Sequence, residues 1–226
     1  MAIYLIRHGQ SEGNAQELFQ GQLDFALTPL GMQQARAFAG WLKRLELPWR
    51  ALISSPLKRA LQTAQILSAE AGLPAPLLEP RIAEYAGGEL EGIGSVEIDA
   101  RWPEYKDRPL EERGDFSRFG GESYEQMQQR LGSFVADIRA RHAVEDEVAV
   151  VAHGGSLYQL LKLWCAWPTP RHFFNHIGNC CCFKLELCEV SGHKGARLHW
   201  MLPLELTGGQ VADNSNAAIE SRVEEG

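Results

Sequence analysis

Two segments of the chain place a histidine directly after a run of apolar residues. The first run, 2–6, leads into Arg7-His8-Gly9, and the second, 147–152, leads into His153-Gly154-Gly155. Short apolar runs of this kind predict buried parallel strands, and ligands of open α/β sheets bind at the carboxyl ends of such strands. An arginine and a histidine at that edge could hold an anion and attack it. We therefore expect an anion-binding site there.

Five motifs in this order resemble those of a known family, the histidine phosphatase or phosphoglycerate mutase-like superfamily. Its signature is Arg-His-Gly after the first strand. The matching residues are Arg7-His8-Gly9 with Ser11 and Asn14; Leu27-Thr28 with Gly31 and Gln33 or Gln34; Ser54-Ser55-Pro56 with Arg59-Ala60 and Thr63-Ala64; Glu84 with Gly88, Glu91 and Gly92; and Val151-Ala152-His153-Gly154-Gly155. The likeness spans residues 2–190, with one departure, Leu90, where many members carry tryptophan.

The resemblance implies phosphoryl transfer through a histidine. His8 is the expected nucleophile and would become phosphohistidine. Arg7 and Arg59 would neutralise the phosphate oxygens without a metal, and His153 would add hydrogen-bond donors. Glu84, protonated when the substrate arrives, would protonate the leaving alkoxide and later deprotonate the attacking water. No cofactor is expected.

Auxiliary contacts widen the expected phosphate site. The resemblance gives Asn14 and Gln20 this role, and the full set of expected phosphate-binding residues is Arg7, Asn14, Gln20, Gly21, Arg59, Glu84, His153 and Gly154. Glu89 and Glu91 compete with Glu84 for the acid's role because all three lie in one glycine-rich loop. His172 and His176 are spaced as a pair of metal ligands would be, but no third ligand has a supporting spacing, so we expect no metal.

Alternating strand and helix patterns predict the elements that would position these residues. Thr28 should cap a helix that begins at Pro29 and runs to about Leu45. The other expected helices are 57–71, 122–142 and 154–164, and the other expected strands are 51–54, 77–78, 181–187 and 196–202. This order predicts an α/β fold, a three-layer α/β/α sandwich around a mostly parallel sheet.

We expect one domain over residues 1–206, followed by a polar, disordered tail at 207–226. The irregular stretch 93–121 is either a surface excursion or a lid over the site, and we favour the lid. Its candidate specificity residues are Trp102, Tyr105, Arg108, Arg118 and Phe119.

Composition excludes several classes of protein. With 22 basic and 29 acidic residues in 226, the net charge of −7 argues against nucleic-acid binding and against an anionic membrane partner. No apolar run reaches membrane-spanning length, and we find no secretory signal. The five cysteines have neither disulfide nor zinc spacing, which favours free, mostly buried thiols in the cytoplasm.

The expected activity is metal-independent hydrolysis of small phosphate esters. A cofactor-dependent phosphoglycerate mutase is the main alternative, but such mutases carry a longer insertion between the acid and the second histidine than this chain does. The phosphatase branch of the family includes enzymes for sugar phosphates, phosphoserine and α-ribazole phosphate. An inactive module that binds phosphorylated ligands is disfavoured because Arg7, His8, Arg59, Glu84 and His153 are all present. A homodimer remains open.

Overall fold

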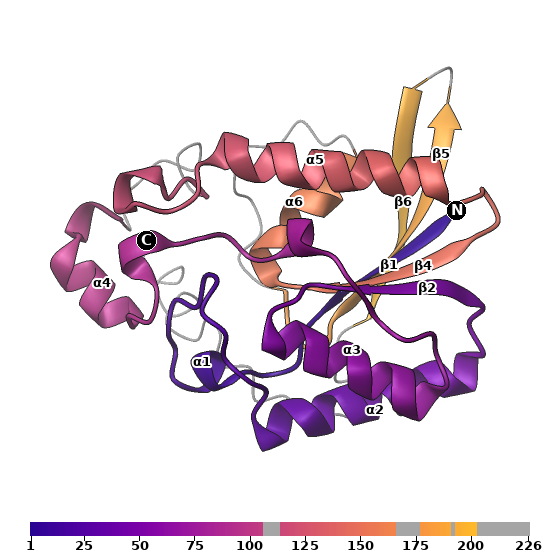
Figure 1. The fold of residues 1–226 in the computed structure, drawn as a ribbon, viewed down its shortest axis with the longest axis horizontal. Coiled ribbons are helices and arrows are strands. Elements are labelled where there is room, and N and C mark those ends of the chain that lie inside the picture. The colour runs from indigo at the N-terminus through magenta and orange to yellow at the C-terminus, as the bar shows by residue number, and fades with distance from the viewer. Residues whose placement is uncertain (106–113, 166–176, 191–192, 203–226) are drawn as a thin grey trace, which may run out of the picture.

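The structure is a computed structural model that describes residues 1–105, 114–165, 177–190 and 193–202 (Figure 1). Arg108, the histidine pair at 172 and 176, and the tail at 207–226 lie outside the described residues. The expected boundaries of the domain therefore stay a prediction.

Six strands form one mixed sheet in the order β3-β2-β4-β1-β5-β6 (Figure 1). Four strands run parallel, namely β1 (Ala2–Arg7), β2 (Trp49–Ser54), β3 (Leu77–Leu78) and β4 (Glu147–Ala152). The other two, β5 (Cys182–Val190) and β6 (His193–Leu202), are antiparallel to their neighbours. The expected α/β fold with a mostly parallel sheet is confirmed.

The central strand β1 is buried on both faces, which explains its continuous apolar sequence. Tyr4 and Ile6 belong to a hydrophobic cluster on one side of the sheet, and Ile3 and Leu5 to a cluster on the other. None of these four side chains is exposed to solvent. This alternation fixes the register of β1, because a slip of one residue would exchange its two faces.

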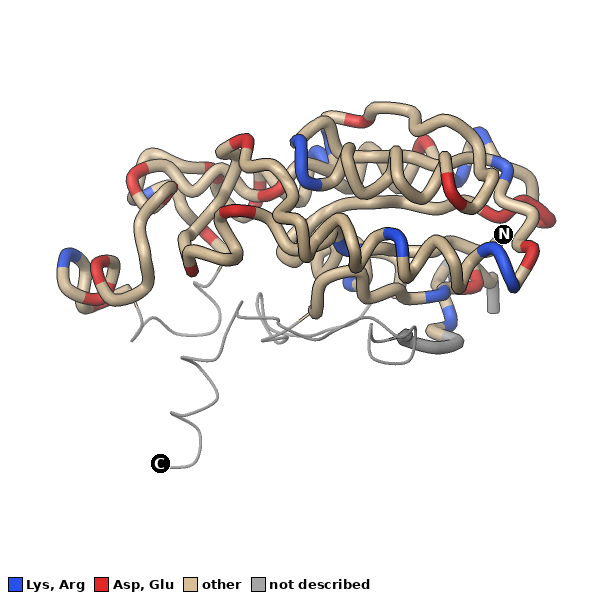
Figure 2. Tube along the Cα trace, turned by 90° about the horizontal axis from the view of Figure 1, so that it is seen from below, with Lys and Arg blue, Asp and Glu red and all other residues tan. Residues whose placement is uncertain are grey.

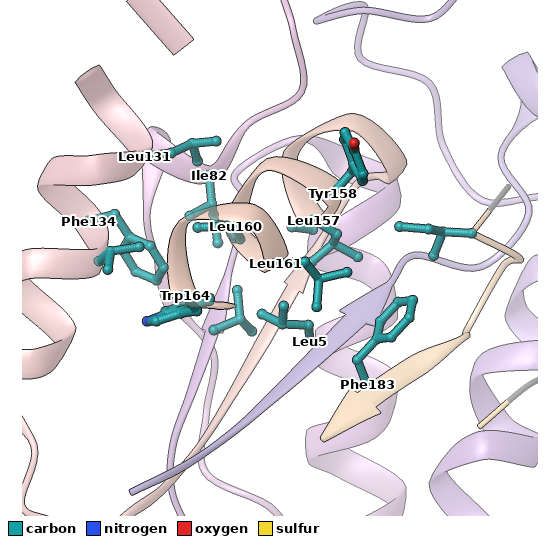
Figure 3. Close-up of a cluster of buried hydrophobic side chains, with 14 of the residues drawn as sticks. Leu5, Ile82, Leu131, Phe134, Leu157, Tyr158, Leu160, Leu161, Trp164 and Phe183 are labelled. Atoms are coloured by element: carbon teal, nitrogen blue, oxygen red, sulfur yellow. The ribbon is translucent and has the colours of Figure 1, made fainter. Parts of the chain in front are cut away.

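Helices cover both faces of the sheet and complete the three layers. Figure 1 shows α2 (Pro29–Leu45) and α3 (Lys58–Ala71) on one face, with α5 (Tyr124–Arg141) and α6 (Gly154–Cys165) on the other. Figure 3 shows the second layer: Leu157, Leu160, Leu161 and Trp164 of α6 lie among Leu131 and Phe134 of α5, Leu5 of β1 and Phe183 of β5. The buried face of α6 therefore holds that helix against β1, the strand that ends directly before His8.

The expected boundaries lie within two residues of the observed ones for α2, α3, α5 and α6, and β3 is as predicted. In contrast, β5 ends three residues later and β6 begins three residues earlier than expected. The Thr28 side chain accepts a hydrogen bond from Gly31 N (3.0 Å), so α2 begins with the predicted cap. Two short helices were not predicted, α1 (Glu12–Ala15) and α4 (Ser95–Arg101), and β2 begins at Trp49 rather than at 51. Such short segments show too few periods of a hydrophobic pattern to be recognised.

The distribution of charged positions and the state of the cysteines agree with what the composition predicts. Basic and acidic positions are interspersed along the trace in Figure 2. No helix of the described part of the chain is long and apolar enough to cross a membrane. All five cysteines are free thiols, and three of them are buried, as predicted: Cys182 begins β5, and Cys180 and Cys181 directly precede it.

The turn after β1 packs directly on the first turn of α2. A Cβ atom on Gly9 would lie 2.5 Å from Gly31 O, and one on Gly31 would lie 2.0 Å from Gln10 O. Both distances are far below van der Waals contact, and both involve main chain that cannot rotate away. Glycine at these two positions therefore allows the first turn of α2 to pack against the turn that follows His8.

Two substitutions in α2 should shift stability in opposite directions. Gly40 has open space around its Cβ position, so Gly40→Ala should raise the free energy of unfolding by about 0.5–1 kcal/mol. Gly31→Ala should lower it by about 1–3 kcal/mol because the new methyl group must displace the main chain of Gln10. Urea denaturation measures both, and stabilisation by Gly31→Ala would contradict the packing described here.

Candidate active site

The two histidines meet because β1 and β4 pair in parallel and end together. Arg7 is opposite Ala152, and His8 N donates to Ala152 O (3.0 Å). The His8 and His153 ring centroids are 5.2 Å apart. The structure thus brings both strand-end histidines to one edge of the sheet.

His8 is oriented by its own main chain. The side chain is only 2% exposed, and Nδ1 lies 2.6 Å from Gly9 O. A carbonyl can only accept, so Nδ1 carries the proton and the lone pair is on Nε2. The His8 carbonyl accepts from Asn179 Nδ2 (3.0 Å) and from Cys180 N (3.3 Å), which fixes the backbone behind the ring. The imidazole is held in the tautomer that a nucleophile at Nε2 requires.

Two arginines bring positive charge to the same edge. Arg59 is 1% exposed and donates through Nη1 to Leu23 O (2.7 Å) and through Nη2 to Gly21 O (2.8 Å). Burial, with a smaller contribution from Arg7, lowers the pKa of Arg59 to about 10 against the opposing charge of Glu84, so the guanidinium remains charged at neutral pH. Arg7 donates through Nη1 to the carbonyl of Ile177.

His153 is completely buried and uses both ring nitrogens within the protein. Arg59 Nε donates to Nδ1 (3.1 Å), so the proton is on Nε2, which lies 2.8 Å from Ser55 Oγ. Burial lowers the pKa of His153 well below its usual value, and the charges of Arg59 and Arg7 lower it further. The expected hydrogen bonds from His153 to a phosphate would replace one of these contacts, a detail that the sequence did not indicate.

The Glu84 carboxylate lies at the N-terminus of α6. Oε2 accepts from Gly155 N (2.9 Å), and Oε1 accepts from Ser156 N (3.0 Å) and Tyr85 N (3.1 Å). A Cβ on Gly155 would lie 2.5 Å from Oε1, so the glycine leaves room for the carboxylate. Helix N-termini stabilise negative charge, and this one begins immediately after His153.

The rival glutamates have other positions. Glu89 is exposed, whereas Glu91 Oε1 accepts from Gln22 N (2.9 Å) and Gly87 N (2.7 Å). The Glu91 carboxylate also fills the space beside Gly21, where a Cβ would lie 2.0 Å from Oε1. Glu91 therefore joins two loops, and Glu84 is the glutamate of this loop that contacts the helix behind His153.

The remaining expected phosphate ligands surround this edge. Ser11 Oγ lies 2.9 Å from Asn14 Oδ1 and 2.6 Å from Gln20 Oε1, so both amides turn their oxygens toward Ser11. Gly21 has a positive φ of 49° and offers its carbonyl to Arg59. At Gly154, the Cβ position lies 3.9 Å from Arg7 Nε. The positions of these residues would allow the oxygens of a bound phosphate to accept hydrogen bonds from their N–H groups.

Several supporting residues gave no signal in the sequence. Asp24 Oδ1 accepts from Lys58 N (2.6 Å) at the start of α3, where the N-cap residue Leu57 has no side-chain acceptor. Arg130 forms an ion pair with Glu122 (2.6 Å) beneath the Glu84 loop. Asp24 and Lys58 are 34 residues apart, and Arg130 and Glu122 are eight residues apart, and no local pattern marks either contact. Within the described ranges, no three His, Cys, Asp or Glu side chains are grouped as metal ligands would be.

The buried, neutral His153 predicts that stability falls in mild acid. The unfolded chain binds a proton near the ordinary pKa of 6.5, whereas the folded protein does not, so the folded state loses stability as pH falls below that value. The slope from this one group should approach about 1.4 kcal/mol per pH unit. Urea denaturation of the wild type and of His153→Gln between about pH 5 and pH 7 compares the slopes; equal slopes would show that His153 titrates normally in the folded protein.

Comparison with known proteins identifies the family. The family model described as histidine phosphatase superfamily (branch 1) matches residues 3–196. A 2,3-bisphosphoglycerate-dependent phosphoglycerate mutase from Methylobacterium radiotolerans is 36% identical over 71% of this chain and 77% of its own. A metal-independent phosphoserine phosphatase from Arabidopsis thaliana is 35% identical over 69% of this chain and 65% of its own.

A solved structure agrees with these matches. The mycobacterial glucosyl-3-phosphoglycerate phosphatase in complex with VO3 superposes with a TM-score of 0.77 at 29% identity, covering 88% of this chain and 97% of its own. The family model and the fold cover the same strands and the same edge of the sheet. The chain belongs to the histidine phosphatase superfamily, branch 1.

Proposed function

We propose that this protein is a metal-independent phosphomonoesterase that hydrolyses small phosphate esters through a phosphohistidine at His8. One observation carries the proposal: the 2.6 Å contact of His8 Nδ1 with Gly9 O, which puts the lone pair on Nε2. The ring centroid of His8 lies 5.2 Å from that of His153, which is bound by the buried Arg59. A neutral imidazole nitrogen among buried positive charges suits attack on a phosphate dianion, whose negative charge those groups attract.

The arginines are proposed to bind the phosphoryl group. Buried cations act in a water-poor site, where their attraction for the charge of the transition state is much stronger than in bulk water. The Nδ2 of Asn14 and the Nε2 of Gln20 have no hydrogen-bond acceptor in the described part of the chain, so both are suited to donate to phosphate oxygens. A substrate phosphate would then be surrounded by donors from β1, the 14–21 loop and α3.

Glu84 is the proposed general acid and base. Its carboxylate lies within one turn of His153 and close enough to Arg59 for their charges to interact. In the unliganded state its two oxygens accept three backbone hydrogen bonds. The protonated form would donate to the ester oxygen as the bond to phosphorus breaks, and the carboxylate would then take a proton from water.

Hydrolysis, rather than mutase activity, is favoured by the short segment between Glu84 and His153. A mutase must keep water away from phosphohistidine while its substrate reorients. The described part of that segment contains α4 and an aromatic group in which Trp102 and Tyr105 pack edge-on against Phe119, with centroids 5.7 and 5.8 Å away. We propose that residues 93–121 form the lid over the site and carry the specificity residues. Relatives at similar identity include phosphatases and mutases alike.

Steady-state assays in EDTA test the activity. The wild type should release phosphate from para-nitrophenyl phosphate and from some members of a panel of phosphoserine, sugar phosphates and phosphoglycerates. His8→Ala should reduce kcat by about 10³-fold or more, because the nucleophile is lost. Arg141→Met, which removes an exposed arginine whose ion pair among the described residues is with Asp137, is the control and should leave kcat unchanged.

A second assay separates the alternatives. Phosphoglycerate and its bisphosphate are supplied together, and isomerisation is measured beside phosphate release. Isomerisation faster than hydrolysis would make the protein a mutase. Binding of phosphate or vanadate without turnover of any substrate would make it a recognition module, and activity in His8→Ala equal to that of the wild type would refute the proposed nucleophile.

A further inference from the structure

The segment that carries Glu84 lies outside the sheet and the long helices. It follows a short 3-10 helix, η1 (Pro80–Ile82). Within the described residues, the carbonyls of Arg81, Ala83 and Glu84 accept no hydrogen bond from a backbone N–H. Ile82 anchors it on one side, where its unexposed side chain lies in the same cluster as Leu131 and Leu160 (Figure 3). Buried carbonyls require donors, so another group must satisfy this turn.

Arg130 of α5 supplies those donors. Its Nη1 donates to Arg81 O (2.6 Å) and to Ala83 O (2.8 Å), and its Nη2 donates to Glu84 O (3.1 Å). One guanidinium thus fixes three carbonyls over four consecutive residues, a geometry that depends on a planar fork of donors. Only Gln22 Nε2 (3.0 Å) also donates to the Glu84 carbonyl among the residues that the structure describes.

Glu122 holds the guanidinium in place. Arg130 Nε donates to Oε1 (2.6 Å) and Nη2 to Oε2 (2.8 Å), and the two side chains are only 18% and 12% exposed. Glu122 N also donates to Ala86 O (2.8 Å), two residues beyond Glu84. Buried ion pairs often contribute little net stability, so geometry is the better explanation for a pair placed here.

From this geometry we infer that Arg130, fixed by Glu122, is a positioning residue that sets the place of the Glu84 carboxyl group relative to the leaving-group oxygen. The inference rests on the proposed role of Glu84 as the general acid. Arg130 does not reach the phosphate in this account; it acts through the main chain of residues 81–84. The ion pair also links the end of the 93–121 segment to the acid, because Glu122 follows that segment directly.

A comparison of two aryl phosphates tests the inference, because general acid catalysis matters most for a basic leaving group. Phenyl phosphate and para-nitrophenyl phosphate have similar shapes, but phenoxide needs a proton far more. The quantity compared is kcat/KM, which covers only the steps up to formation of phosphohistidine, because the later attack of water is the same for both substrates. Arg130→Met should reduce kcat/KM for phenyl phosphate by about 10–100-fold and that for para-nitrophenyl phosphate by less than about threefold. Glu84→Gln should show the same selectivity with a larger loss, and Arg141→Met should match the wild type.

Conservative variants keep the test decisive if Arg130→Met does not fold. Arg130→Lys keeps the charge but lacks the fork, and Glu122→Gln keeps the shape of the partner but not its charge. Both should show the same selective loss to a smaller degree, with a circular dichroism spectrum like that of the wild type. An equal loss on both substrates, or no loss in any Arg130 or Glu122 variant, would overturn the positioning role.

Glu84→Gln separates this inference from the function on which it rests. If Glu84→Gln is selective and the Arg130 and Glu122 variants are not, only the positioning role fails. If Glu84→Gln itself loses equally on both substrates, the assignment of Glu84 as the acid fails, and the positioning role fails with it.

Discussion

Parallel pairing of β1 with β4 is the constraint on which the rest of the structure depends. The register that places Arg7 opposite Ala152 ends both strands at one level, so the residues that follow, His8 and His153, meet across the sheet. That register is held by side chains buried in two hydrophobic clusters, one on each face. A change of register would expose those side chains at a cost in free energy. Burial therefore fixes the register and, with it, the distance between the two histidines.

Buried positive charge lies at this edge of the sheet, and contacts within the protein keep the charged side chains in place. Arg59 binds two loop carbonyls and His153, and the pKa of His153 is lowered so that the ring stays neutral between two arginines. The proposed acid is supported by another layer: Glu84 contacts the N-terminus of α6, and its loop is bound from α5. The proposed nucleophile and the proposed acid are therefore held by separate supports.

The sequence predicted the fold and the two histidines at neighbouring strand ends because both follow from local patterns. Apolar runs ending in histidine marked β1 and β4, and Thr28-Pro29 marked the start of α2. Long-range contacts could not be predicted in this way. Nothing near Arg130 or Asp24 indicates that one binds three carbonyls and the other caps a distant helix, because those partners become neighbours only after folding.

The isomer of phosphohistidine formed during turnover tests the central claim most directly. The enzyme is quenched in alkali while it turns over para-nitrophenyl phosphate, digested, and the labelled peptide is examined by phosphorus NMR. Because His8 Nδ1 is bound to Gly9 O, the account predicts phosphorus on Nε2 of His8. Phosphorus on Nδ1, on His153, or on no histidine in an enzyme that is turning over would contradict it.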